Sequence, residues 1–197
     1  MTPGITVAIP THPARMRNGM LNRALQSVFR QTELPQAISL AIDSGGEGAF
    51  KVRQRALDAV QTEYVAFLDS DDELLPQHLQ ACAEVMKRLD AAFVFSWFEP
   101  VGMADPLGHF GRPFDAQKPH HTTMTVLCRT DIAQEIGFKE PAPGYRVGNE
   151  DWHFILDFCK IAVDRNLLMV HLAERTWRYY YHGMNTSGLP YKGDALA

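Results

Sequence analysis

The amino-acid sequence predicts an α/β fold with a mainly parallel central sheet and helices on both faces. Through residues 5–98, short apolar segments rich in β-branched and aromatic residues alternate with segments whose apolar residues recur at helical spacing. This alternation is typical of strands joined by helical crossovers, which run parallel in one sheet. Polar or acidic residues follow directly after three of the strand segments, at the sheet edge where such folds bind ligands.

The first half of the chain divides into four predicted strands and three predicted helices. The strands are the short apolar segments 5–9, 37–42, 64–68 and 92–98. The helices are the amphipathic segments 19–31, 52–60 and 76–86. We expect Pro10 to end the first strand. Pro76 fits the first turn of the third helix, where a missing N–H leaves no helical hydrogen bond unmade.

The second half of the chain is less regular. Residues 99–121 contain glycine, proline and histidine without periodicity, and they predict a long loop over the site. Strands are expected at 122–128 and 167–172. The helix between them has a predicted apolar face made of Trp152, Ile155, Leu156, Cys159 and Val163. We expect the tail after Gly183 to be mobile.

Composition and charge describe one soluble, packed domain. The 197 residues are 46% hydrophobic and 21% charged, and the formal net charge is −4, which gives no electrostatic reason to expect nucleic acid as the main partner. Cys82, Cys128 and Cys159 lie far apart in apolar contexts, which predicts buried free thiols in a reducing compartment. We find no signal peptide and no apolar segment near the roughly 20 residues of a membrane span, so we expect a cytoplasmic protein without a membrane span.

Three carboxylates follow the third predicted strand. Asp69, Asp71 and Asp72 lie at its carboxyl end, and packing them together is unfavourable unless a cation or hydrogen bonds compensate. Oxygen ligands suit Mg²⁺ or Mn²⁺, which complete their coordination with water and substrate phosphates. The alternative is a solvated acidic turn before the next helix, and the residues alone leave both interpretations open. An EF-hand loop is excluded because Leu74 stands where that loop requires glycine.

The ends of the first two strands are expected at the same edge of the sheet. Pro10-Thr11-His12 follows the first strand, so Thr11 or a backbone amide could contact a nucleotide and His12 could lie against a base. The alternative is an ordinary turn between a strand and a helix. Asp43 follows the second strand and begins a glycine-containing segment that lacks the spacing of a dinucleotide fingerprint.

Four further residues have two interpretations each. Arg53 lies on a short basic helix and could pair with a diphosphate or face solvent. Glu150 and Asp151 precede an amphipathic helix, where acidic residues commonly cap the helix N-terminus. His182 follows an aromatic stretch, in which a lone histidine is more often structural than a ligand.

The joint pattern of motifs is more specific than any of its parts. The pattern Leu-x-x-Ala-Leu-x-Ser-Val-x-x-Gln-Thr covers residues 21–32, and Glu-Tyr-Val-Ala-Phe-Leu-Asp-Ser-Asp-Asp covers residues 63–72. An Arg-helix-Gly-Phe segment covers 129–138, Gly-Asn-Glu-Asp-Trp covers 148–152, and Arg-x-x-x-His covers 178–182. Over about residues 5–187 the chain resembles the inverting GT-A glycosyltransferases of family 2. It departs from the family pattern at His12, Pro13, Ser44 and Asn149.

This resemblance implies a Rossmann-like GT-A fold and a role for each candidate residue. The catalytic residues would be Asp151, as the general base, and Glu150. The donor-binding residues would be Pro10, Thr11, His12, Asp43, Arg53, Asp69 and Ser70. The ligands of Mn²⁺ or Mg²⁺ would be Asp71, Asp69 and His182. The helix N-terminus would keep Asp151 ionised without making it more basic than an ordinary aspartate, whose pKa is about 3.9.

The resemblance also implies a reaction and a division of the chain. A metal-dependent enzyme would move a sugar from a nucleoside-diphosphate sugar to the hydroxyl of a saccharide or another acceptor, with inversion. Residues 1–197 would form one domain, in which about 1–98 bind the nucleotide sugar, about 99–187 bind the acceptor and carry the catalytic residues, and 188–197 form the tail. Because Ser44 replaces an aspartate that reads the base in the family, GDP and dTDP donors stay as open as UDP.

Three alternatives remain at this stage. A non-catalytic nucleotide-sugar-binding domain would explain the departures at His12, Pro13 and Ser44. A sugar nucleotidyltransferase has a related fold, but the chain has no glycine-rich, basic N-terminal loop for a triphosphate. A phosphatase of the haloacid-dehalogenase type also places Asp-x-Asp after a strand, but it uses the first strand and a later lysine.

Overall fold

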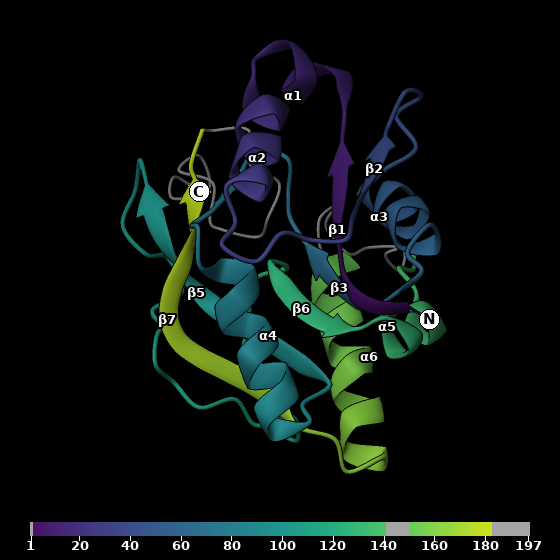
Figure 1. The fold of residues 1–197 in the computed structure, drawn as a ribbon, viewed down its shortest axis with the longest axis vertical. Coiled ribbons are helices and arrows are strands. Elements are labelled where there is room, and N and C mark those ends of the chain that lie inside the picture. The colour runs from purple at the N-terminus through teal and green to yellow at the C-terminus, as the bar shows by residue number, and fades with distance from the viewer. Residues whose placement is uncertain (1, 141–149, 183–197) are drawn as a thin grey trace, which may run out of the picture.

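The computed structural model describes residues 2–140 and 150–182 (Figure 1). Within these ranges the strands are β1 (Thr2–Thr11), β2 (Ala37–Ile42), β3 (Thr62–Phe67), β4 (Glu73–Leu74), β5 (Phe93–Val101), β6 (Val126–Arg129) and β7 (Met169–Tyr180). The helices are α1 (Pro13–Arg17), α2 (Met20–Phe29), α3 (Ala49–Asp58), α4 (His78–Leu89), α5 (Thr130–Ile136) and α6 (Glu150–Asp164). The expected tail after Gly183 and the Gly148-Asn149 part of the acidic motif lie outside the described residues.

All seven strands form one sheet in the order β2-β1-β3-β6-β5-β7-β4. The pairs β1–β2, β1–β3 and β5–β7 are parallel, whereas β3–β6, β5–β6 and β4–β7 are antiparallel. The predicted α/β fold is confirmed, and the mainly parallel description holds only approximately. Residues 102–125 lead from β5 to β6 without a helix, and a connection without a crossover allows the neighbouring strand to run in the opposite direction.

Helices cover both faces of this sheet, as the sequence predicts. Phe93 and Ser96 of β5 point to opposite faces because side chains alternate along a strand. The ring of Phe93 packs on Phe158 of α6 at 5.1 Å between centroids. On the other face, Ser96 and His78 of α4 both bond to the hydroxyl of Thr176. Helix α4 therefore lies across β5 and β7 on the opposite side from α6 (Figure 1).

An aromatic group fixes the start of α6 against β3. Phe154 stacks on Phe138 with centroids 4.5 Å apart, and Phe67 meets both rings edge-on. Phe67 is the last residue of β3, and Phe154 lies one turn after Glu150. The first turn of α6 and the carboxyl end of β3 are consequently held together by buried apolar contacts.

The predicted strands and helices lie where the sequence places them, with differences at their ends. Strand β1 continues past Pro10 to Thr11, because pairing with β3 stops at Ala8 and the missing N–H of Pro10 lies beyond that ladder. Helix α4 begins at His78, so Pro76 precedes the helix instead of occupying its first turn. Strand β6 covers only the end of the expected segment 122–128.

Two regions differ more strongly from the prediction. The buried face of α6 consists of Glu150, Phe154, Ile155, Phe158, Cys159 and Ala162, and Val163 is exposed. Strand β7 extends from Met169 to Tyr180, beyond the expected end at residue 172, through an exposed charged stretch with a shift in its register against β5. This extension brings the aromatic residues before His182 to the site described below.

The three cysteines agree with the expectation of buried thiols. Cys82, Cys128 and Cys159 are buried and unbridged. No helix in the described ranges combines the length and the apolar character that crossing a membrane would require.

Candidate active site

A tight turn after β3 brings three carboxylates together. Leu68 continues the sheet by donating its N–H to the carbonyl of Ala8, and the N–H of Asp72 donates to the carbonyl of Asp69 at 3.0 Å. The chain then enters β4 at Glu73. One oxygen from each of Asp69, Asp71 and Asp72 lies within 4.8 Å of the others, so the cluster expected from the sequence forms.

Two arginines pair with Asp69 and Asp71 of this cluster. Arg53 of α3 pairs with Asp69 at 2.7 Å between Nη2 and Oδ1. Arg15 of α1 pairs with Asp71 at 2.6 Å between Nη2 and Oδ2. His182 approaches the same Oδ2 of Asp71 through its Nε2 at 2.9 Å. His182 therefore lies beside the acidic cluster.

The pKa values of the two buried aspartates move in opposite directions. Burial would raise the pKa of Asp71, but the hydrogen bond with His182 and the charge of Arg15 outweigh burial and lower this pKa. Burial, together with the charges of Asp71 and Asp69, raises the pKa of Asp72 well above its ordinary value. The partner of Asp72 is the backbone N–H of Tyr180, which donates to Oδ1 at 3.0 Å. Asp71 thus loses its proton more readily than an ordinary aspartate, and Asp72 loses its proton less readily.

Arg53 also connects this cluster to the start of α6. Its guanidinium is buried, and it donates through Nη1 to Glu150 and through Nη2 to Asp69. Glu150 is 4% exposed, so its charge depends on this pairing. Arg53 was predicted either to bind the donor or to face solvent. It is buried between the carboxylates of Glu150 and Asp69 and does not face solvent.

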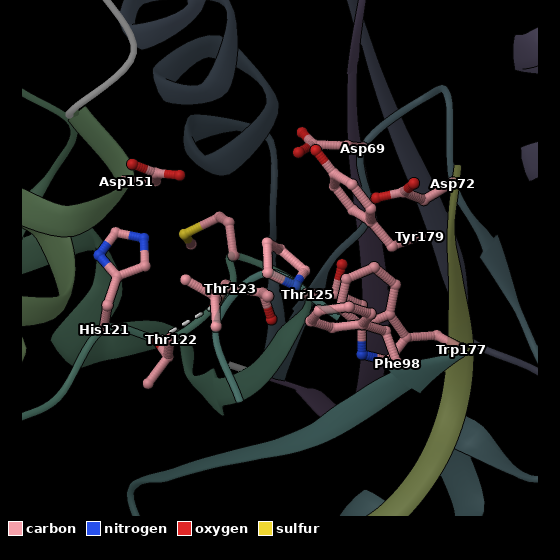
Figure 2. A pocket seen from close by; sticks show the side chains of 13 residues that line it. Asp69, Asp72, Phe98, His121, Thr122, Thr123, Thr125, Asp151, Trp177 and Tyr179 are labelled. Carbon is pink, nitrogen blue, oxygen red and sulfur yellow. Dashed lines mark hydrogen bonds between the residues drawn. The ribbon is translucent and has the colours of Figure 1, made fainter. Parts of the chain in front are cut away.

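Asp151 faces a cavity of about 150 Å³ that it shares with the acidic cluster. The cavity is lined by Asp69 and Asp72 on one side and by Asp151 on the other (Figure 2). Burial raises the pKa of Asp151 to about 6; Arg53 opposes this shift and Glu150 adds to it. The expectation that Asp151 is no more basic than an ordinary aspartate is wrong, because burial outweighs the effect of the helix N-terminus.

Hydroxyl and aromatic side chains complete the cavity. Residues 122–125, Thr-Thr-Met-Thr, run along its wall between Asp151 and the acidic cluster (Figure 2). Phe98, Trp177 and Tyr179 form an aromatic group at the cluster side, with Trp177 5.2 Å from Phe98 between ring centroids. His121 lies at the far end of this wall and contacts Trp152 at 4.8 Å between rings. Such walls offer apolar faces together with a few polar groups, as small-molecule sites do.

The ends of β1 and β2 lie at the same sheet edge as the cluster. The N–H of Asp43 donates to the carbonyl of Thr11 at 2.8 Å, and the hydroxyl of Thr11 is buried without a hydrogen bond to any residue that the structure describes. Pro10 pairs with β2, and His12 precedes α1, where burial and Arg15 lower the pKa of its imidazole. Pro10, Thr11 and His12 are thus beside one another at the edge where a ligand is expected.

Asp43 and Ser70 already have partners within the protein. The carboxylate of Asp43 accepts the backbone N–H groups of Gly45, Glu47 and Gly48, which lowers the pKa of Asp43 and shapes the loop before α3. Ser70 is fully buried inside the acidic turn, and its hydroxyl accepts a long hydrogen bond from Arg15 at 3.5 Å. Asp43 consequently acts on its own loop in this structure.

Sequence reasoning missed two arginines of the site. Arg15 pairs with Asp71, and Arg23 of α2 donates to the carbonyl of Asp71 while its guanidinium lies 3.6 Å from the ring centre of Tyr180. Three basic residues between positions 15 and 23 were the available signal, since they follow a strand end that faces an acidic cluster. The aromatic and threonine parts of the cavity had no sequence signal, because Phe98, residues 122–125 and Trp177 lie far apart along the chain.

The donor set fits a hard divalent cation. Carboxylate oxygens are the ligands that Mg²⁺ and Mn²⁺ prefer, and the three aspartates provide them from one turn. Burial and the like charges of Asp71 and Asp69 raise the pKa of Asp72, and a bound cation would favour its ionised form. Asp69, Asp71 and Asp72 are therefore suitable metal ligands, with His182 beside Asp71.

Comparison with known proteins places this geometry in a family. The family model described as glycosyl transferase family 2 matches residues 36–139. The succinoglycan biosynthesis protein ExoW of Rhizobium meliloti (strain 1021) is 31% identical over 161 residues, which cover 67% of this chain and 48% of ExoW. The chain thus spans about half the length of this relative.

Solved structures of S. aureus TarS share the fold. TarS 1-349 in complex with UDP-GlcNAc superimposes with a TM-score of 0.73 at 16% identity, over 94% of this chain and 60% of that one. TarS 1-349 in complex with UDP gives a TM-score of 0.69 at 16% identity, over 92% and 61% of the two chains. With the acidic turn, the shared cavity and the family match to more than half of its residues, this chain belongs to glycosyl transferase family 2.

Proposed function

We propose that this protein transfers a sugar from a nucleoside-diphosphate sugar to an acceptor hydroxyl, with inversion and with the help of Mn²⁺ or Mg²⁺. The observation that carries the proposal is one cavity with an acidic cluster on one side and Asp151 on the other. The complexes of TarS with UDP and UDP-GlcNAc support a nucleotide-sugar donor for this fold. Residues 1–98 would bind the donor, and residues 99–187 would bind the acceptor and provide the base.

The acidic side of the cavity suits the donor's diphosphate. Asp69 and Asp71 would hold the divalent ion, with His182 beside Asp71. Bound there, the ion would neutralise charge that develops on the leaving nucleoside diphosphate. Thr11 provides a buried hydroxyl without a described partner at the same sheet edge, where the nucleoside would contact it.

The opposite side suits a general base. Asp151 would accept the proton of the acceptor hydroxyl while that oxygen forms a bond to the anomeric carbon. The bond from the anomeric carbon to the diphosphate breaks, and its electron pair leaves with the nucleoside diphosphate. A pKa of about 6 makes Asp151 a stronger base than an ordinary aspartate, yet leaves it ionised at neutral pH. Glu150 would keep Arg53 in place and add to the basicity of Asp151.

Two substitutions separate the two sides. Asp151→Asn should lower the transfer rate by about 10²–10⁴-fold, the usual contribution of a general base, while metal-dependent donor binding stays nearly intact. Asp71→Ala should remove the metal dependence of donor binding. Titration calorimetry with UDP, GDP and dTDP sugars, with and without Mn²⁺, and a transfer assay with saccharide acceptors measure both effects.

The outcomes are distinct. If Asp151→Asn loses transfer and donor binding equally, Asp151 is not the general base. If Asp71→Ala binds the donor with unchanged metal-dependent affinity, the metal does not bind at this turn. If the wild-type protein binds a nucleotide sugar tightly but neither transfers nor hydrolyses it, a binding domain without catalysis replaces the proposed enzyme.

A further inference from the structure

Arg15 occupies the carboxylate that a divalent ion would need. Its Nη2 lies 2.6 Å from Oδ2 of Asp71, and its Nη1 lies 3.5 Å from the hydroxyl of Ser70. The same Oδ2 also contacts Nε2 of His182 at 2.9 Å. A cation on this oxygen must therefore share it with, or take it from, the guanidinium of Arg15.

Arg15 is less firmly held than the two other arginines around the cluster. Arg53 is buried between two carboxylates, and Arg23 is fixed by the carbonyl of Asp71 and the ring of Tyr180. The side chain of Arg15 is 18% exposed, compared with 9% for Arg53. Movement of Arg15 consequently breaks fewer buried contacts than movement of either neighbour.

The helix that carries Arg15 is also weakly anchored. Helix α1 has five residues, none of them buried, and His12, the N-cap residue that precedes it, makes no capping hydrogen bond through its side chain. Gly19, with a positive φ of 81°, joins α1 to α2, and no atom lies within 4 Å of the position that a Cβ would take there. A small shift of α1 therefore meets little resistance from packing.

We propose that Arg15 is a diphosphate-binding residue, which pairs with Asp71 when no donor is bound and passes to the donor's phosphates when a divalent ion takes that carboxylate. The proposal rests on the proposed function, because it needs a metal and a diphosphate at this turn. The guanidinium presents planar N–H donors that match phosphate oxygens, so it loses no charge pairing in the exchange. Arg15 then competes with the metal in the empty protein and cooperates with it in the donor complex.

This exchange predicts effects of opposite sign for one substitution. Arg15→Gln removes the competing cation, so Mn²⁺ alone should bind roughly three- to tenfold more tightly. The same substitution removes charge-assisted hydrogen bonds to the diphosphate, so the nucleoside diphosphate should bind about tenfold more weakly at saturating Mn²⁺. Arg15→Lys keeps the charge without the planar fork and should give intermediate values in both measurements.

The test uses the full chain and two binding measurements. Free Mn²⁺ is followed by electron paramagnetic resonance in a titration without nucleotide. UDP, GDP and dTDP are then titrated calorimetrically at saturating Mn²⁺, and whichever binds the wild-type protein is used for the variants. Arg17→Gln is the matched control, because Arg17 lies on the same helix, is exposed and forms no ion pair with the described residues. It should match the wild type in both titrations.

Each result decides between the alternatives. Opposite shifts in Arg15→Gln, absent in Arg17→Gln, support the proposal. Wild-type binding of both ligands combined with unchanged or weaker Mn²⁺ binding in Arg15→Gln overturns the role of Arg15 and leaves the proposed function standing. If the wild-type protein binds no Mn²⁺, the metal-dependent function fails first, and the exchange fails with it. Where Arg15→Gln melts below the wild type, Arg15→Lys provides the deciding shifts.

Discussion

The two walls of the cavity are built from different chemistry. On the β3 side, Asp69 and Asp72 belong to a turn in which each carboxylate already has a partner: Arg53 for one and the Tyr180 N–H for the other. On the opposite side, residues 122–125 provide hydroxyl groups, and Asp151 accepts the backbone N–H of Trp152 at 2.7 Å. One wall carries the carboxylates of the acidic turn, and the other carries threonine side chains near Asp151 (Figure 2).

In the proposed reaction, this difference would let one cavity bind a charged donor and a neutral acceptor. On the acidic side, Asp69 would keep its buried partner Arg53, whereas Asp71 would exchange Arg15 for the divalent ion that accompanies the diphosphate. A hydroxyl acceptor carries no charge, so its wall needs hydrogen-bonding groups and a base whose pKa lies near neutrality. Arg53 belongs to both walls, because it contacts Asp69 on one side and Glu150 beside Asp151 on the other.

The largest effect should follow from removing this shared arginine. Arg53→Ala leaves buried Glu150 and half-buried Asp69 without their cation, which should lower the free energy of unfolding by about 3–5 kcal/mol. Arg55→Ala, two residues along α3, removes an exposed pair with Glu47 and should lower it by about 1 kcal/mol or less. Urea denaturation of both variants measures the difference. Equal losses would mean that the two walls do not depend on a shared buried charge.

The second effect concerns the pH dependence of transfer at the acceptor wall, by which we mean residues 122–125 and Asp151. A base must be ionised, and the pKa of Asp151 is raised to about 6, so kcat/KM for transfer should fall about tenfold per pH unit below this value. Because Glu150 helps to raise the pKa, Glu150→Gln should move this acidic limb to lower pH. Rate profiles between pH 4.5 and 8 would show both changes.

A control separates the walls in this experiment. Nucleotide binding should stay level across pH 5.5–7 if the acidic limb belongs to Asp151. A parallel loss of nucleotide binding would assign the limb to the carboxylates of the β3 turn, and the contrast between the walls would then be lost.

The carboxylates of the β3 turn could be predicted from the sequence, whereas on the opposite wall only Asp151 could be. Asp69, Asp71 and Asp72 are local: one strand and one turn bring them together, so a short motif is sufficient. Strands β1, β2 and β3 were also predictable, because each is a short apolar segment followed by a polar turn. The role of Arg15 could not be predicted, because its partner Asp71 is distant in the sequence and only the fold brings the two together.

The acceptor wall depends on long-range contacts that periodicity does not report. Helix α6 is apolar on more than one face, and contacts with Phe67 and Phe93 of the sheet decide which face is buried. The face predicted to be apolar, which included Trp152 and Val163, is therefore rotated from the face that is buried. Strand β7 was predicted to end at residue 172, where charged residues follow, yet pairing with β5 continues to Tyr180 through two shifts in register. The aromatic part of the cavity comes from this continuation.

The smallest effect should come from one hydroxyl of the acceptor wall. The Oγ1 of Thr123 is buried at the cavity and has no hydrogen-bonding partner among the residues that the structure describes, whereas Thr122 donates to the carbonyl of Thr123 at 3.3 Å. A buried polar atom without a partner is unfavourable until a ligand or water satisfies it. Thr123→Val should therefore leave stability unchanged or raise it by up to about 1 kcal/mol, while the KM for the acceptor rises a few-fold.

Thr122→Val provides the opposite pattern, because it removes an existing hydrogen bond and should lower stability by about 0.5–1.5 kcal/mol. Thermal melting and acceptor kinetics on the two variants give four values with defined signs. If Thr123→Val melts below the wild type by as much as Thr122→Val does, the Thr123 hydroxyl is satisfied within the folded protein. The wall would then present shape alone to the acceptor, and its specificity would depend on the aromatic residues at the cluster side.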